Sequence, residues 1–294
     1  MFWEQLAGNL IQGLALGAVY GVATMGLALI FGVLRVVNVG HGALIMLGAF
    51  LTWGAFQATG QPLAALPVAL LAGTAIGFFF YHTAIRRLLK GPELASLLAT
   101  FALGLLLEES VKHTVGAEAR GFNWDLGSLD LGITVFPYTK LLAVLGSLLA
   151  ALGVYLWFRH TRLGTATRAV VQDEQGARAC GIPVDLVYAT SFAMGTGLTV
   201  VSGVLAALWN PVGIEPNMGG SFTLRAFAIA VLGGLSSPYG AFFAGLLFGL
   251  VENGAFTLLS LAPGVEPFAL TRFLAFAMLL IVLLVRPTGL MGSA

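Results

Sequence analysis

The stretch GLALGAVYGVATMGLALIFGVLRVVNVGHGALIMLGAF, residues 13–50, holds one charged side chain, Arg35. No other charged side chain occurs between Glu4 and Arg86. Because a helix needs about 20 mostly apolar residues to cross a lipid bilayer, this stretch predicts two spanning helices joined by a short polar turn. The fold expected from it is an all-α bundle embedded in a membrane.

The composition of the whole chain favours the same class. Of 294 residues, 58% are hydrophobic and 9% are charged, whereas soluble domains carry about 25% charged residues. The mean hydropathy is +0.94, and the net charge of +1 gives no basic field for nucleic acid. A single cysteine, Cys180, excludes an internal disulfide. The N-terminus lacks the positive region of a cleavable signal, so the first span is expected to remain in the mature protein.

Apolar runs between charges and Gly or Pro breaks predict about eight or nine spans in a single transmembrane domain, residues 1–294. An outer loop is expected at about 113–138 and a cytoplasmic loop at about 159–186. The candidate spans are 6–31, 41–58, 63–86, 94–112, 139–158, 187–208, 222–235, 239–260 and 269–286.

The basic residues predict the orientation, because short cytoplasmic loops are enriched in Lys and Arg. Nine of the fourteen basic residues fall on one side of the predicted topology, and the opposite side is acidic. An odd number of spans with the N-terminus outside and the C-terminus inside satisfies both observations. The nine are Arg35, Arg86, Arg87, Lys90, Arg159, Arg162, Arg168, Arg178 and Arg286, and the acids are Glu4, Glu118, Asp125, Asp130, Glu215 and Glu266.

The segment 222–235 is too short to cross a bilayer unaided, contains Arg225 and is flanked by glycine pairs. Short, glycine-interrupted segments are typical of broken helices that line transporter cavities. A tilted helix extended by its loops is the alternative. A similar order of apolar helix, polar break and small-residue helix around residues 32–42 suggests that the two breaks are related features of two halves.

Glycines recur at intervals of four in two of the predicted spans. Gly13, Gly17 and Gly21 lie on one helix face, and Gly245 and Gly249 repeat the pattern. Bare backbone on a helix face lets another helix approach closely. The pattern predicts close packing within the bundle, with a subunit interface as the alternative.

An ionisable side chain lies near the middle of the span 239–260. Glu252, next to Asn253, would be costly in lipid unless it is paired or wetted. These residues are therefore candidates for the translocation pathway, and a structural hydrogen bond between helices is the alternative.

The segment RHTRLGTATRAVVQDEQGARACGIPVDL, residues 159–186, is the longest polar piece on the basic side. A short helix is expected over 166–180, ended by Gly181 and Pro183. A free helix of about 15 residues is marginal, so it either docks on its own bundle or is presented to a partner. Small and apolar residues (Ala169, Val170, Ala177, Cys180) would share one face, and Arg168, Gln172, Asp173, Glu174 and Arg178 would form polar edges.

Several sequence signatures are missing. The chain has no G-x-x-x-x-G-K-[ST] phosphate-binding loop, no H-E-x-x-H, no G-x-S-x-G and no His/Cys cluster. We therefore expect no catalytic site, no metal site and no cofactor in this chain. Any energy for work must come from outside it.

Three segments resemble the permease subunits of bacterial branched-chain amino-acid ABC transporters. Residues 13–50 are similar to the N-terminal signature, TATRAVVQDEQGARACGIPVDLV (165–187) to the ATPase-coupling loop, and FAIAVLGGLSSPYGAFFAGLLFGLVE (227–252) to the C-terminal glycine motif. The chain departs from the family pattern at Gly40, Gly176 and Ser236. Gly176 replaces an alanine of the coupling helix and should loosen it by up to about 1 kcal/mol.

The resemblance implies a transport subunit in the bacterial inner membrane that works with other chains. These are a second homologous permease, two ABC ATPases that carry ATP and Mg, and a periplasmic substrate-binding protein. It implies import of branched-chain or related small amino acids, with urea, amides or aromatic acids as alternatives. The residues implied in coupling to the ATPases are Arg168, Gln172, Asp173, Glu174, Ala177, Arg178 and Gly181.

The polar residues of the turn at 32–42 have two interpretations. Arg35 would anchor at the headgroups, Asn38 and Gly40 would permit a turn, and His41 would open the next helix. One interpretation is a charged hairpin, and the other is that Asn38 and His41 line the cytoplasmic end of the pathway or its gate. A rival from another class is an ion-coupled secondary transporter that uses Glu252 as its ion site.

Overall fold

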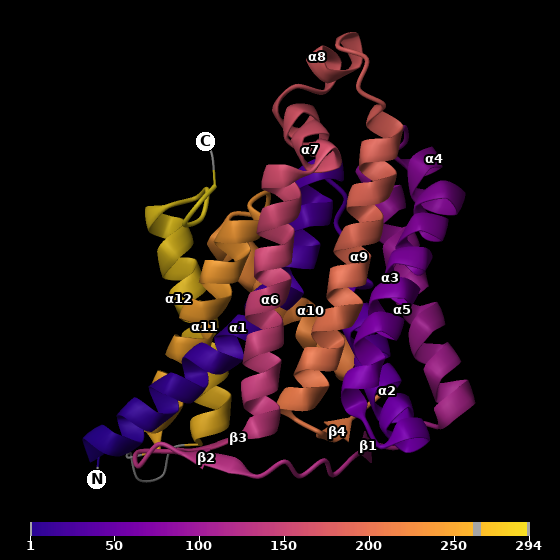
Figure 1. The fold of residues 1–294 in the computed structure, drawn as a ribbon. Helices are drawn as coiled ribbons and strands as arrows, with labels where there is room; N and C mark the ends of the chain where they lie inside the picture. The colour runs from indigo at the N-terminus through magenta and orange to yellow at the C-terminus, as the bar shows by residue number, and fades with distance from the viewer. Residues whose placement is uncertain (1, 261–265, 293–294) are drawn as a thin grey trace.

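A computed structural model describes residues 2–260 and 266–292. Long helices run side by side and form a bundle (Figure 1). Two small strand pairs and the N-terminus lie at one end of the bundle, the hairpin end, and α7 (Arg162–Gln172) and α8 (Glu174–Ala179) project from the other, the arm end. The expected all-α polytopic bundle is confirmed.

Seven helical stretches in the described residues are long and apolar enough to cross a membrane, and two shorter apolar helices accompany them. Together they correspond to the nine expected spans, and the segment expected to be short or broken is the short α10. The helices that correspond to the expected spans are α1 (Phe2–Leu34), α2 (His41–Thr59), α3 (Ala65–Phe80), α5 (Glu93–Val115), α6 (Tyr138–His160), α9 (Val184–Trp209), α10 (Met218–Gly233), α11 (Pro238–Leu259) and α12 (Pro267–Val285).

The third span is a composite helix. A short 3-10 turn, η1 (Pro62–Ala64), precedes α3, and a π-helical turn, η2 (Tyr81–Ile85), connects α3 to α4 (Arg86–Leu88). The expected boundary near residue 86 therefore falls inside a continuous helical stretch. The added turn widens the helix where Tyr81 packs against Phe192 of α9.

The helices α1 and α11 pack with their backbones in close contact. A Cβ at Gly17 would lie 2.7 Å from the carbonyl oxygen of Gly245, and one at Gly13 would lie 2.6 Å from that of Gly249. A Cβ at Gly21 would lie 2.8 Å from the carbonyl oxygen of Phe242. The glycines at intervals of four thus face each other inside this chain, and only a residue without a side chain fits there.

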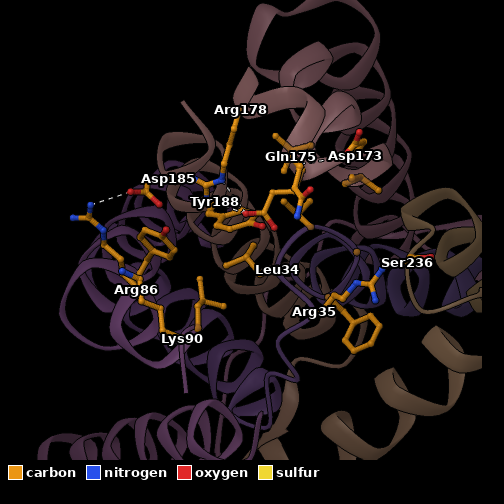
Figure 2. A pocket seen from close by; sticks show the side chains of 18 of the residues that line it. Leu34, Arg35, Arg86, Lys90, Asp173, Gln175, Arg178, Asp185, Tyr188 and Ser236 are labelled. Carbon is orange, nitrogen blue, oxygen red and sulfur yellow. Dashed lines mark hydrogen bonds and ion pairs between the residues drawn. The ribbon is translucent and has the colours of Figure 1, made fainter. Parts of the chain in front are cut away.

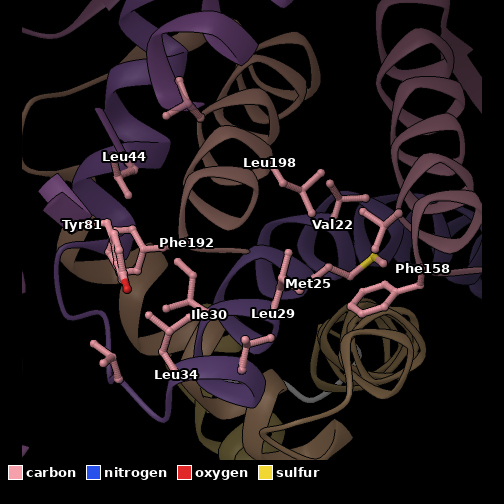
Figure 3. Packing of buried hydrophobic residues seen from close by; sticks show 14 of the residues in the cluster. Val22, Met25, Leu29, Ile30, Leu34, Leu44, Tyr81, Phe158, Phe192 and Leu198 are labelled. Carbon is pink, nitrogen blue, oxygen red and sulfur yellow. The ribbon is translucent and has the colours of Figure 1, made fainter. Parts of the chain in front are cut away.

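The other side of α1 packs against α9. Figure 3 shows Met25, Leu29 and Ile30 of α1 beside Phe192 and Leu198 of α9, in a cluster of buried apolar residues. Because both helices are largely enclosed by their neighbours, they form the centre of the bundle and the other helices surround them.

The loop expected at 113–138 contributes three strands to two small antiparallel pairings. β1 (Arg120–Gly121) pairs with β4 (Val212–Ile214), and β2 (Ser128–Asp130) pairs with β3 (Val135–Pro137). In the second pair Leu129 lies opposite Phe136. These strands cover the hairpin end of the helices (Figure 1).

The single helix expected over 166–180 is wrong, because Asp173 divides it into α7 and α8. Asp173 has an extended backbone (φ −153°, ψ 105°), and its carboxylate accepts a hydrogen bond from the amide of Gln175. Aspartate favours this N-cap position over a helix interior because it binds free amides at a helix start. A Cβ at Gly176 would lie 2.5 Å from the Asp173 carboxylate, so glycine makes room for the cap.

The expected helix end at Gly181 is observed. Gly181 has φ +78°, and its amide binds the carbonyl of Arg178 while the amide of Ile182 binds that of Ala177. This paired pattern closes the end of α8 and requires a left-handed residue. We call α7 and α8 together the arm. It begins at the N-cap residue Thr161, bends at Asp173 and ends at the turn formed by Gly181.

Candidate functional site

One face of the arm is anchored and the other is free. Val170 and Ala177 are buried in the core cluster of the bundle, and α7 packs on the last turns of α6, where a Cβ at Gly164 would overlap the Trp157 carbonyl. Of the seven residues implied in coupling, Ala177 is buried and the other six remain exposed: Arg168, Gln172, Asp173, Glu174, Arg178 and Gly181. The arm is thus fixed to the bundle and still presents a polar surface.

An ion pair on α8, between Glu174 and Arg178, is joined to α9 by a hydrogen bond from Tyr188. The Arg178 guanidinium donates twice to Glu174 Oε1, at 3.1 and 2.9 Å, and the Tyr188 hydroxyl also bonds Glu174. These hydrogen bonds hold the pKa of Glu174 below its ordinary value. The stabilisation is therefore complete above that ordinary pKa and is lost as the pH falls through the lowered one.

A cavity of about 1380 Å³ lies at the arm end, between the end of α1, α4, the arm and α9 (Figure 2). Its wall is rich in cations: Arg35, Arg86, Arg87, Lys90 and Arg178 line it, against the carboxylates of Asp173, Glu174 and Asp185. Arg86 donates to Asp185 at 3.0 Å. Five of the nine basic residues that the sequence assigned to one side therefore line one cavity.

Arg35 lines this cavity in an unusual backbone conformation. Its φ is +55°, and among the described non-glycine residues it alone has a positive φ. Its amide bonds the carbonyl of Phe31 and so ends α1. A non-glycine residue in the left-handed region costs free energy.

The segment between α1 and α2 enters the bundle, and its backbone is satisfied by hydroxyl groups. The Thr100 hydroxyl of α5 accepts from the amide of Val39 and donates to the carbonyl of Val37, both at 3.1 Å. Thr223 of α10 accepts from the amide of Gly42 at 2.9 Å. Irregular backbone at membrane depth requires such partners.

Asn38 and His41 are buried beside this segment. Asn38 is 1% exposed and His41 is 0% exposed, so neither lies on a solvated hairpin. His41 Nδ1 is 3.4 Å from the Thr199 hydroxyl. Its Nε2 and both polar atoms of the Asn38 amide have no hydrogen-bond partner among the described residues. Unsatisfied buried polar groups are costly, so these two residues are candidates for contact with a passing molecule.

We predict that Asn38→Leu raises thermal stability and lowers transport. Removing the unsatisfied amide should stabilise the protein by about 1–3 kcal/mol, whereas any contact made during transport is lost. The measurements are a thermal melt and substrate uptake in proteoliposomes. A variant that is less stable than wild type would show that the amide has a structural partner.

We predict that Asp173→Ala loosens α8 without unfolding the bundle. Loss of a helix cap costs about 1 kcal/mol, which corresponds to amide hydrogen exchange about fivefold faster in residues 174–180. Asp173→Asn is the matched control, because asparagine also caps helices. Equal protection in Asp173→Ala and wild type would contradict the role given to this side chain.

Glu252 and Asn253 lie on α11, away from Asn38 and His41. Glu252 Oε1 is 3.4 Å from the guanidinium of Arg225 on α10, which also lies over the ring of Tyr20. The Asn253 amide donates to the Gly249 carbonyl at 3.2 Å. No hydrogen bond or ion pair between described residues connects this group to Asn38 or His41.

The sequence reasoning missed several partners. Arg225 was visible as the charge within a short span, but its pairing with Glu252 was not, because the two residues lie on different helices. Thr199 and Thr223 gave no signal, since single hydroxyl residues are common in apolar helices. Within the described ranges no group of three or more His, Cys, Asp or Glu side chains is placed to hold a metal.

These features define a class: a polytopic helical membrane protein, with a central glycine-packed helix pair and a polar arm at one end. The family described as branched-chain amino acid transport system / permease component matches residues 9–283, and the chain belongs to this family.

Curated relatives match over nearly the whole length. The high-affinity branched-chain amino acid transport system permease protein BraD of Pseudomonas aeruginosa is 28% identical, over 97% of this chain and 95% of BraD. The corresponding LivH protein of Escherichia coli (strain K12) is also 28% identical, over 97% and 94%. A chain in the structure of PsaBC from Streptococcus pneumoniae in complex with Fab has a TM-score of 0.53 and 16% identity, covering 98% and 97%, and supports the fold.

Proposed function

We propose that this chain is the membrane-spanning subunit of an ATP-driven importer of branched-chain or related small amino acids. The family membership and the two full-length relatives support the transport class and the substrate. In this proposal ATP and Mg bind to two separate ABC ATPases, a second homologous permease completes the membrane part, and a periplasmic binding protein delivers substrate.

The arm is the observation that carries the coupling part of the proposal. It is held to the bundle through Val170 and Ala177, yet its polar edge is exposed. A force applied to that edge would reach α6 through α7 and α9 through the Glu174–Arg178–Tyr188 contacts. Closure of the ATPases would thereby change the packing of the spanning helices.

The proposed orientation follows from the charges. In this proposal the arm end lies in the cytoplasm of a bacterium, and the cations around the large cavity support that assignment. The hairpin end, with the N-terminus and the strand pairs, then faces the periplasm. This arrangement puts the arm beside the ATPases and the hairpins beside the binding protein.

The rival function, an ion-coupled secondary transporter, has less support. It needs Glu252 as an ion site, but Oε1 of that carboxylate faces Arg225. The rival also leaves the exposed polar edge of the arm without a role.

The test is site-specific crosslinking in the active complex. Native Cys180 is exposed and is first replaced by serine. Arg168→Cys and Glu174→Cys should then crosslink to an ATPase subunit, and the yield should change with ATP. Asp130→Cys, at the hairpin end, is the control and should not react with that subunit. Failure of both arm positions in a complex that transports would overturn the coupling proposal.

A further inference from the structure

A second cavity, of about 480 Å³, lies toward the hairpin end between α1, α6, α9 and α10. Lys140 in the first turn of α6 and Arg225 in α10 are its charged lining residues. Leu16, Val19, Trp209 and Phe222 supply apolar walls. Its volume falls in the range of about 300–1000 Å³ that is usual for small-molecule sites.

The two cations of this cavity, Lys140 and Arg225, carry more N–H donors than there are acceptors near them. Lys140 has no carboxylate partner among the described residues, and its ammonium lies 3.4 Å from Gln12 Oε1 and 4.7 Å from the centre of the Trp209 ring. Arg225 donates to Glu252 at 3.4 Å, and a guanidinium has five N–H donors. Several donors therefore remain for an anion in the cavity.

The cost of placing these charges here also indicates a ligand. Cations in membrane-spanning segments are rare and mark substrate or ion pathways. A small inorganic anion would satisfy the donors but leave the apolar walls in contact with water. A carboxylate joined to an apolar group satisfies both surfaces.

We propose that this cavity binds the carboxylate of a small amphipathic acid, an amino acid with an apolar side chain, between Lys140 and Arg225. The side chain of the ligand packs against Trp209 and Phe222. The assignment of the ligand as transported substrate rests on the proposed function, and it places a binding site within this single subunit on the side from which substrate arrives.

The first test is binding to the full chain in nanodiscs of phosphatidylcholine, with radiolabelled L-leucine as the probe. We expect saturable binding that Lys140→Gln weakens about tenfold, the effect of one charged hydrogen bond. Lys140→Arg should retain binding. Leucinol, which lacks the carboxylate, should not compete. Lys112→Gln is the matched control, because Lys112 lies on α5 and pairs with Glu109.

Three outcomes in phosphatidylcholine nanodiscs would overturn the proposal. They are no saturable leucine binding, equal affinity in Lys140→Gln and wild type, and competition by leucinol as strong as by leucine. A lipid headgroup shares the anionic chemistry, so the experiment is repeated with phosphatidylglycerol in the nanodiscs. Loss of leucine binding there would assign the cavity to lipid and also overturn the proposal.

Uptake by the assembled complex separates this inference from the proposed function. Stimulation of ATP hydrolysis by the loaded binding protein in the wild-type complex reports the function, whereas the KM for uptake by Lys140→Gln, which is expected to rise, reports the site. Unchanged uptake kinetics with intact stimulation would reject the site alone. No stimulation and no uptake in wild type would reject the function, and the nanodisc result would still decide whether the cavity binds leucine.

Discussion

Gly17→Val is expected to lower the thermal unfolding temperature by about 10 °C and to reduce the yield of monodisperse protein. The new side chain would meet backbone atoms of α11, the Gly245 carbonyl oxygen and the Leu246 Cα, both 2.7 Å from the Cβ position. Backbone cannot rotate away, so α1 and α11 must separate. Overpacking of this kind costs about 3 kcal/mol, and each kcal/mol moves the midpoint by about 2–4 °C in a chain of this size.

The control for this substitution is Gly153→Val. Gly153 lies in α6, is exposed, and has no atom within 4 Å of its Cβ position. Its replacement should leave the melting temperature unchanged or slightly higher, because valine has the higher helix propensity. The comparison uses size-exclusion chromatography and a thermal melt of both variants. A Gly17→Val protein as stable as Gly153→Val would contradict the close packing of α1 and α11.

Glu252→Ala is expected to destabilise the protein by about 1–3 kcal/mol, because it leaves the partly buried Arg225 guanidinium without its carboxylate. The Arg225 and Glu252 side chains are only 21% and 14% exposed, so water replaces the lost partner poorly. Arg225→Met combined with Glu252→Leu should recover most of the loss, since it removes both charges.

The measurement is a double-mutant cycle on thermal or denaturant unfolding in detergent, with Arg225→Met as the other single variant. A coupling free energy near zero would show that the pair is solvated and does not stabilise the bundle. Uptake by Glu252→Gln gives a separate readout. Retained ATP-driven uptake would exclude proton transfer at Glu252, which the secondary-transporter alternative requires.

The sequence was sufficient for the spans and insufficient for the contacts between them. Hydropathy places helices because the bilayer demands about 20 apolar residues whatever they pack against. The left-handed position at Gly181 was also predictable, since a glycine with a proline two residues later, Pro183, is a local signal for a helix end. The division of the arm at Asp173 was not, because the helix propensity of the surrounding residues outweighed one capping residue.

The candidate site, too, could be predicted from the sequence only in part. Glycines at intervals of four predicted a close contact, but the partner of Gly17 is known only once α11 is folded against α1. Asn38 and His41 were singled out as polar residues in an apolar run. Their burial depends on Thr100 and Thr223, which reach the entering segment from two other helices, and no local pattern encodes that.

The contact between α1 and α11 also constrains the order in which the protein is made. Gly13 and Gly249 are separated by 236 positions (249 − 13), so the ribosome needs roughly 10–50 s after α1 before its packing partner is synthesised. During that interval the bare glycine face of α1 is exposed to lipid or to other helices in the membrane. Truncated chains that end before α11 should therefore be substrates for membrane quality-control proteases.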